Sequence, residues 1–173
     1  MKAYGLQRVI RTVRDEAERV GRDPASVRIW SCCAVVGDWL AEDVRLKKTV
    51  GRMATYLQGY GDLMVRTNEW DPAVLERFRA DPFVAGFRCA IDNTATTAQL
   101  EHLATLIPSE WLAAAGLGTA KECAAAVLRQ MDLGADSVII HGAAPSELAP
   151  MVEAYRTIRP AGRFDHLSSN PGV

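Results

Sequence analysis

The sequence predicts a helix-rich α/β fold in which two parallel strands alternate with helices. Two runs rich in β-branched residues, at 27–36 and 136–141, each lie between segments whose apolar residues have helical spacing. The first run is almost continuously apolar after Arg28, as expected for a strand covered on both faces. Two strands are too few to close a (β/α)8 barrel, which normally takes roughly 250 residues.

Composition and charge describe an ordinary globular domain spanning residues 1–173. The chain is 49% hydrophobic and 24% charged, enough apolar residue to bury a core. Its 20 basic and 21 acidic residues give a net charge of -1, which argues against binding to nucleic acid. No segment has the apolar length of a membrane span, and the amino terminus lacks the core of a secretory signal.

The four cysteines have neither disulfide nor zinc spacing. They stand at Cys32, Cys33, Cys89 and Cys123, without a CxxC pair, so we expect no metal site and a reducing, cytoplasmic compartment. Adjacent residues on a strand point to opposite faces, so Cys32 and Cys33 are expected to pack rather than share a ligand.

The first half of the chain contains three helical patterns. Apolar residues from Leu6 to Val20 recur at three- and four-residue steps, and Gly21 is a natural stop. Helical spacing returns over 41–57. Asp71 and Pro72 then supply a cap and a first-turn proline for a helix reaching Arg79. The structure of 59–70 is left open.

The second half predicts a loop and then further helices. Residues 80–108 are expected to form a loop followed by a helix at 97–106, and 109–115 one short turn. Thr119 and Glu122 form a capping box for a helix that runs to about Met131 and stops at Gly134. The last helix is predicted over 146–158, with Ser146 as its cap, and the tail after residue 160 is irregular.

Three residues are candidates for a ligand site. His141 ends the second strand, and an imidazole there could contact a cofactor ring or a substrate carbonyl, or serve only as a loop histidine. Asp38 follows the first strand and could instead cap the next helix. Trp70, beside Asp71, is the tryptophan expected nearest a ligand, although core packing is the alternative.

The segment from Gly116 to Thr119 opens a helix and could hold an anion on free backbone amides. The third glycine of the dinucleotide fingerprint is missing, so a structural turn is the favoured interpretation.

Two segments resemble the bacterial luciferase-like monooxygenases. AERVGRDPASVRIW is similar to a helix, a Gly-Arg-Asp-Pro turn and a buried strand of that family. GLGTAKECAAAVLRQMDLGADSVIIHGA is similar to the family's Gly-Thr-Pro-Glu-Glu turn and helix, followed by its last strand, with Ala120 in place of proline and Leu133 before Gly134. The middle of the chain looks more like the deazaflavin-dependent branch.

The resemblance implies the carboxy-terminal part of a (β/α)8 TIM barrel. It also implies an oxidoreductase that acts on paired donors, one of them a small organic substrate. The enzyme would be either a monooxygenase or a deazaflavin-dependent dehydrogenase or reductase. FMN or the deazaflavin coenzyme F-420 would then bind at the carboxyl ends of the strands. The alternative is a non-enzymatic remnant or assembly module that keeps the packing of the barrel without its active site.

Three expectations follow for the chain. The two strands should be parallel if they are adjacent. Their uncovered edges predict a homo-oligomer, or a complex with the missing part of the barrel. Most strand ends that would hold the cofactor lie outside this sequence, so the isolated chain should bind FMN or the deazaflavin weakly.

Overall fold

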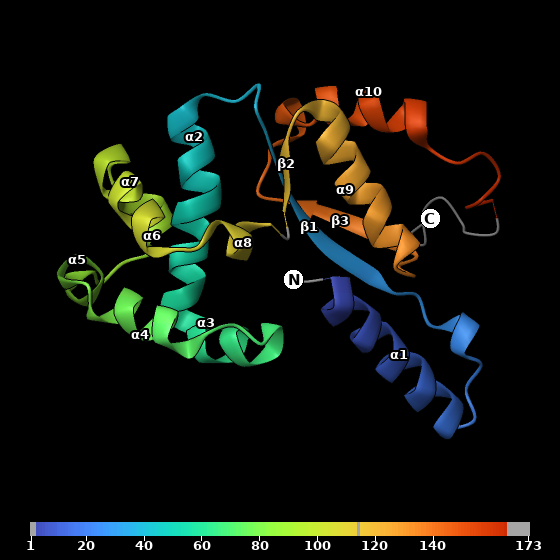
Figure 1. Cartoon of the computed structure of the whole chain (residues 1–173). Helices are drawn as coiled ribbons and strands as arrows, with labels where there is room; N and C mark the ends of the chain where they lie inside the picture. The colour runs from blue at the N-terminus through green and yellow to red at the C-terminus, as the bar shows by residue number, and fades with distance from the viewer. Residues whose placement is uncertain (1–2, 114, 166–173) are drawn as a thin grey trace.

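The sheet of the protein is parallel and has three strands. The computed structural model describes residues 3–113 and 115–165 (Figure 1). The strands are β1 (Trp30–Gly37), β2 (Gly116–Gly118) and β3 (Ser137–His141), in the order β2-β1-β3. The carboxyl-terminal half of β1 pairs with β2, and its amino-terminal half pairs with β3. Strand β1 is therefore the only described strand with neighbours on both sides.

Ten α-helices surround this sheet in the described part of the chain. They are α1 (Ala3–Arg19), α2 (Glu42–Leu46), α3 (Arg52–Asn68), α4 (Pro72–Ala80), α5 (Pro82–Gly86), α6 (Ile91–Thr94), α7 (Thr97–Leu106), α8 (Ser109–Leu112), α9 (Ala120–Asp132) and α10 (Ala149–Ile158). A π-helical turn, Lys47–Gly51, joins α2 to α3, and 3-10 turns occupy Pro24–Ser26 and Pro145–Glu147. Helices α2 to α8, here called the helical lobe, lie on one side of the sheet, opposite α9 and α10 (Figure 1).

The two faces of β1 have different neighbours. Cys33 and Val35 are each 1% exposed, and Val35 packs with Cys123, Val127 and Met151 of α9 and α10. The amino-terminal part of the other face is more open: Cys32 is exposed and Trp30 is 46% exposed, whereas Val36 farther along the same face is buried. The strand period of two explains the pattern and confirms that Cys32 and Cys33 point to opposite faces. The expectation of a strand covered on both faces, with both cysteines packed, is wrong for Cys32, which is exposed.

The helical lobe has its own apolar core. Leu57, Phe78, Ile91 and Leu103 are fully buried, and they come from four different helices. The interface between α3 and α6 is polar as well as apolar, because Thr55 Oγ1 donates to Asp92 Oδ1 at 2.9 Å and accepts from Asp92 N–H at 3.1 Å. The lobe therefore folds around side chains that the sheet does not supply.

Both predicted strands are confirmed, and they are adjacent and parallel. The first starts at Trp30 rather than Val27, because Val27 closes the 3-10 turn by donating its N–H to Pro24 O, and Ile29 N–H donates to Asp136 Oδ2 at 2.8 Å. Strand β2 was expected to be a turn. It is three residues long and rich in glycine, so only pairing with β1 defines it as a strand.

Helix α3 continues through the segment that the sequence left open. It runs to Asn68 despite two glycines, with a kink at Tyr60, whose φ is -133°. A Cβ on Gly61 would lie 2.7 Å from Leu75 Cδ1, so close packing against α4 requires the small residue there. Tertiary packing therefore outweighs the helix cost of glycine, about 1 kcal/mol.

Other helix boundaries also differ from expectation. The predicted loop before 97–106 contains the short helices α5 and α6, and Asp81 caps α5 by accepting from the N–H groups of Phe83 and Val84. Ser146 does not cap α10. It lies in the 3-10 turn, and Leu148 is the N-cap.

The strand order differs from that of a (β/α)8 barrel. In such a barrel each strand neighbours the next along the chain, whereas here β1 stands between β2 and β3. The connection from β2 to β3 passes over β1 through α9, and the connection from β1 to β2 passes through the helical lobe on the other side (Figure 1). The described fold is thus helix-rich α/β. Its first strand, β1, lies in the middle of the sheet, and the two later strands lie on either side of it.

In the described part of the chain, no helix combines the length and hydropathy needed to cross a membrane.

The core of the lobe gives a first testable prediction. Replacing the fully buried Leu57 by alanine should lower the free energy of unfolding by about 2–5 kcal/mol, because it removes apolar contacts and leaves a cavity. The matched control is Leu63→Ala on the same helix, where leucine is 52% exposed, with an expected loss within about 0.5 kcal/mol. Urea unfolding followed by circular dichroism would measure both. Equal losses would contradict the assigned core.

Candidate functional site

An apolar pocket of about 620 Å³ lies between the open face of β1 and helix α3. Its volume is within the range of small-molecule sites, about 300–1,000 Å³. The pocket follows β1 from Ile29 to Ala34 and reaches His141 at the end of β3. One end therefore lies at the carboxyl end of β3, beside Ala34 in the middle of β1. Parallel α/β proteins bind ligands at the carboxyl ends of their strands.

The pocket walls come from segments far apart in the sequence. Helix α1 contributes Leu6 and Val9, and α3 contributes Met53, Tyr56 and Met64. Methionine side chains are flexible and polarizable, so they adapt to ligands of different shape. Polar groups are few: one is Ser31 of β1, whose hydroxyl donates to Gln130 Oε1 at 2.8 Å.

Two stacked tryptophans form another part of the wall. The ring centroids of Trp70 and Trp111 are 4.2 Å apart, with 8° between the ring planes. The turn at the end of α3 positions Trp70: Glu69 has a left-handed φ of 55°, and Trp70 N–H donates to Val65 O. Trp111 is 3% exposed and belongs to the lobe core. This pair gives the pocket a rigid, flat edge.

Basic side chains gather at the His141 end of the pocket. Lys48 lies in the π-helical turn and Arg52 directly after it; such turns often occur at functional sites. Arg52 Nε lies 2.8 Å from Asp92 Oδ2, an ion pair that braces the guanidinium against α6. Burial, and secondarily the charge of Arg52, lower the pKa of His141, so its imidazole is neutral at pH 7.

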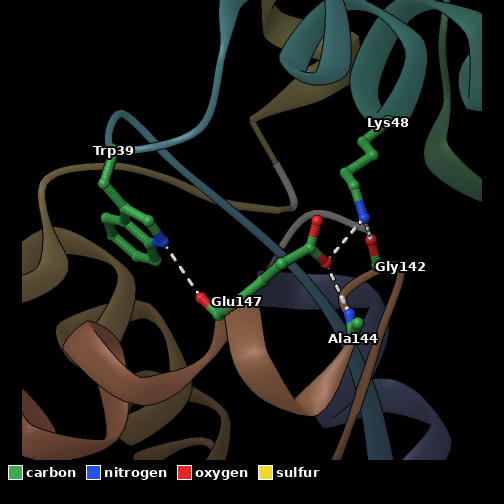
Figure 2. Close-up of polar contacts among 5 residues, drawn as sticks. All are labelled: Trp39, Lys48, Gly142, Ala144 and Glu147. Carbon is green, nitrogen blue, oxygen red and sulfur yellow. Dashed lines mark hydrogen bonds and ion pairs between the residues drawn. The ribbon is translucent and has the colours of Figure 1, made fainter.

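A polar network joins the helical lobe to the loop that follows β3. Lys48 Nζ donates to Gly142 O at 2.6 Å and to Glu147 Oε2 at 2.9 Å, and Ala144 N–H donates to the same carboxylate (Figure 2). Trp39 Nε1 donates to Glu147 O at 3.0 Å. We call these five residues the latch, because they fasten the lobe to the carboxyl edge of the sheet beside the pocket.

Two of the three predicted site residues lie in the pocket wall. The structure brings His141 and Trp70 to the same pocket, from strand β3 and from the α3–α4 turn. Asp38 lies elsewhere: it is exposed, does not line the pocket, and donates its N–H to Gly118 O at 2.8 Å. It does not cap the next helix either, because the N-cap of α2 is Ala41.

The segment from Gly116 to Thr119 has a structural role, but it is strand β2 followed by the N-cap of α9 rather than the expected turn. Glu122 Oε2 accepts from Thr119 N–H at 2.7 Å and from Thr119 Oγ1 at 2.8 Å, which confirms the capping box. A carboxylate thus already occupies the amino terminus of α9, where an anion would otherwise bind. Within the described residues, no group of three His, Cys, Asp or Glu side chains could hold a metal ion.

Sequence reasoning did not identify Lys48 and Arg52 as site residues. Both stand in a helical stretch with the usual mixture of apolar and charged residues, which is also typical of a solvated helix face. The lysine pair preceding Thr49 gave no indication of the π-helical turn. Only the packing of the lobe against the sheet brings these cations to His141.

Searches of protein-family models, of curated proteins and of solved structures find no match to this chain. The resemblance to luciferase-like proteins therefore rests on the sequence motifs described above.

The latch gives a prediction about pH. Hydrogen bonds from Ala144 N–H and then from Lys48 lower the pKa of Glu147 from its ordinary value of 4.5. A lowered pKa means that the carboxylate contributes stability above about pH 4.5, and that this contribution is lost as pH falls through the folded-state pKa. Glu147→Gln should cost about 1 kcal/mol of unfolding free energy at pH 7, and the difference should shrink below pH 4.5.

Thermal unfolding at pH 7 and pH 3.5 would measure this difference. Glu153→Gln is the control, because its ion pair with Arg156 is exposed on the surface of α10 and should contribute almost nothing. A loss for Glu147→Gln that is unchanged between the two pH values would rule out the charged latch.

Proposed function

We propose that this chain forms part of the ligand pocket of a luciferase-like oxidoreductase that uses FMN or a deazaflavin. The observation that carries the proposal is the pocket of about 620 Å³ reaching His141 at the carboxyl end of β3. Ligands of parallel α/β proteins bind at that edge in barrels and in doubly wound sheets alike. The support therefore does not depend on the strand order.

The residues present fit the ring system of such a cofactor. A tricyclic ring is flat and mainly apolar, and the open face of β1 with the Trp70–Trp111 stack offers flat, apolar surfaces. His141 is neutral, so its imidazole can donate one hydrogen bond and accept another. A bound flavin or deazaflavin would supply the redox chemistry, and these residues would orient it and exclude water.

A non-enzymatic assembly module remains the second candidate function. It is favoured by the open side of the sheet, where Trp30 is 46% and Ile139 45% exposed. Trp30 pairs with Ser137 and Cys32 with Ile139, so Trp30 and Ile139 lie on the same face of the sheet, two residues apart in register. Exposed apolar residues on an open parallel sheet are typical of a surface that another polypeptide covers.

Cofactor binding tests the first function. The described pocket uses residues from the ends of few strands, and each contact missing relative to a complete barrel site costs on the order of 1 kcal/mol, where about 1.4 kcal/mol is tenfold. We expect the isolated chain to bind FMN or the deazaflavin with a dissociation constant weaker than micromolar. Fluorescence titration measures it, and Trp70→Ala should weaken the binding further. Micromolar or tighter binding would indicate a complete site.

The oligomeric state of the purified chain tests whether another polypeptide covers the sheet. Strands β2 and β3 each have one edge without a described partner strand. We expect the purified chain to form a homo-oligomer or to need a partner that continues the sheet, and Ile139→Lys to shift it toward monomer by placing a charge on the open face. Light scattering with wild type and with Val152→Lys on α10 as control measures this. A stable wild-type monomer in dilute solution would contradict the expectation.

A further inference from the structure

We propose that the pocket selects an organic acid, with Arg52 as the residue that recognises the acid group. The ligand class is a flat or apolar body that carries one carboxylate or phosphate. The proposal concerns the charge of the ligand and does not require that the reaction be a redox reaction.

The first argument is the charge of the pocket wall. The described residues that line it include Lys48 and Arg52 but no aspartate or glutamate. The acidic partners of these cations, Glu147 and Asp92, do not line the pocket. A ligand in the pocket therefore meets basic groups first. An anionic ligand can accept hydrogen bonds from these donors, whereas a cationic ligand cannot.

The second argument is the unused hydrogen-bonding capacity of Arg52. Lys48 is already engaged by the latch, through Gly142 O and Glu147. Asp92 instead pairs with Arg52 at Nε, and no described residue accepts a hydrogen bond from the two Nη groups of Arg52. A guanidinium can only donate, and its forked geometry matches the two oxygens of an acid group.

The third argument is that Arg52 is held in place before a ligand arrives. Its carboxylate partner Asp92 is 8% exposed and is itself fixed by two hydrogen bonds with Thr55. Gly51 allows this close approach, because a Cβ there would lie 3.2 Å from Asp92 Cα. Bracing of this kind reduces the entropy that a ligand must offset to order the side chain.

The rest of the wall specifies the body of the ligand. Apart from the basic end, most lining side chains are apolar, and the Trp70–Trp111 stack is flat. An aromatic acid matches both parts of the pocket: its ring contacts the apolar wall while its acid group reaches Arg52. The acid group could belong to the organic substrate or to the phosphate of a cofactor, and the experiment below separates these sources.

The test compares acids with their uncharged analogues on the full chain. Binding of 2-naphthoate and of 2-naphthamide would be measured at pH 7 by calorimetry, and FMN and riboflavin would form a second pair that differs by a phosphate. We expect the acid to bind about tenfold more tightly in at least one pair, as a charged hydrogen bond to a partly exposed guanidinium predicts. Preference in the naphthalene pair identifies a substrate acid, and preference only in the flavin pair identifies a cofactor phosphate.

Variants assign the preference to Arg52. Arg52→Gln should abolish it, Arg52→Lys should retain part of it, and Arg156→Gln, a surface control on α10, should leave it unchanged. Should Arg52→Gln fail to fold after losing its contact with Asp92, the wild-type comparison and Arg52→Lys still decide. Equal binding of acid and uncharged analogue in both pairs, or a preference that Arg52→Gln retains, would overturn the proposal. If flavins and deazaflavin do not bind but naphthoate is preferred, the oxidoreductase function fails and this inference stands.

Discussion

Parallel pairing along β1 is the constraint on which the rest of the structure depends. A parallel neighbour cannot be reached by a tight turn, so each strand of this sheet must be followed by a crossover before the chain can pair again. Strand β1 has two neighbours, and its halves pair with different ones. The chain crosses on one side through the helical lobe and on the other through α9, and the pocket is the space left between β1 and the lobe.

Local chemistry explains the parts of the fold that the sequence predicts. The capping box of Thr119 and Glu122 and the Asp71 cap act within a few residues, so the helices α9 and α4 can be recognised without knowledge of their neighbours. Strand β2 and the second half of α3 depend on distant contacts instead. Gly61 is helical because α4 packs against it, and Gly116 is in a strand because Val35 pairs with it.

The candidate site likewise contains residues that the sequence can nominate and residues that only the fold identifies. A residue at the end of a predicted strand, such as His141, can be nominated from sequence because the carboxyl edge of a parallel sheet is a general location for ligands. The importance of Arg52 depends on the position of Asp92 and on the absence of acidic side chains among the described residues of the wall, and both are properties of the folded chain. Asp38 also follows a predicted strand, but it is exposed and lies outside the pocket.

The latch has a consequence for the energetics of binding. The pocket has one wall on the sheet and the other on the helical lobe, and the contacts of Lys48 with Gly142 and Glu147 hold the lobe and the sheet at one separation. A molecule that contacts both walls stabilises the same separation, so occupancy of the pocket and closure of the latch are linked equilibria. By reciprocity, the factor by which a closed latch tightens occupancy equals the factor by which occupancy tightens the latch.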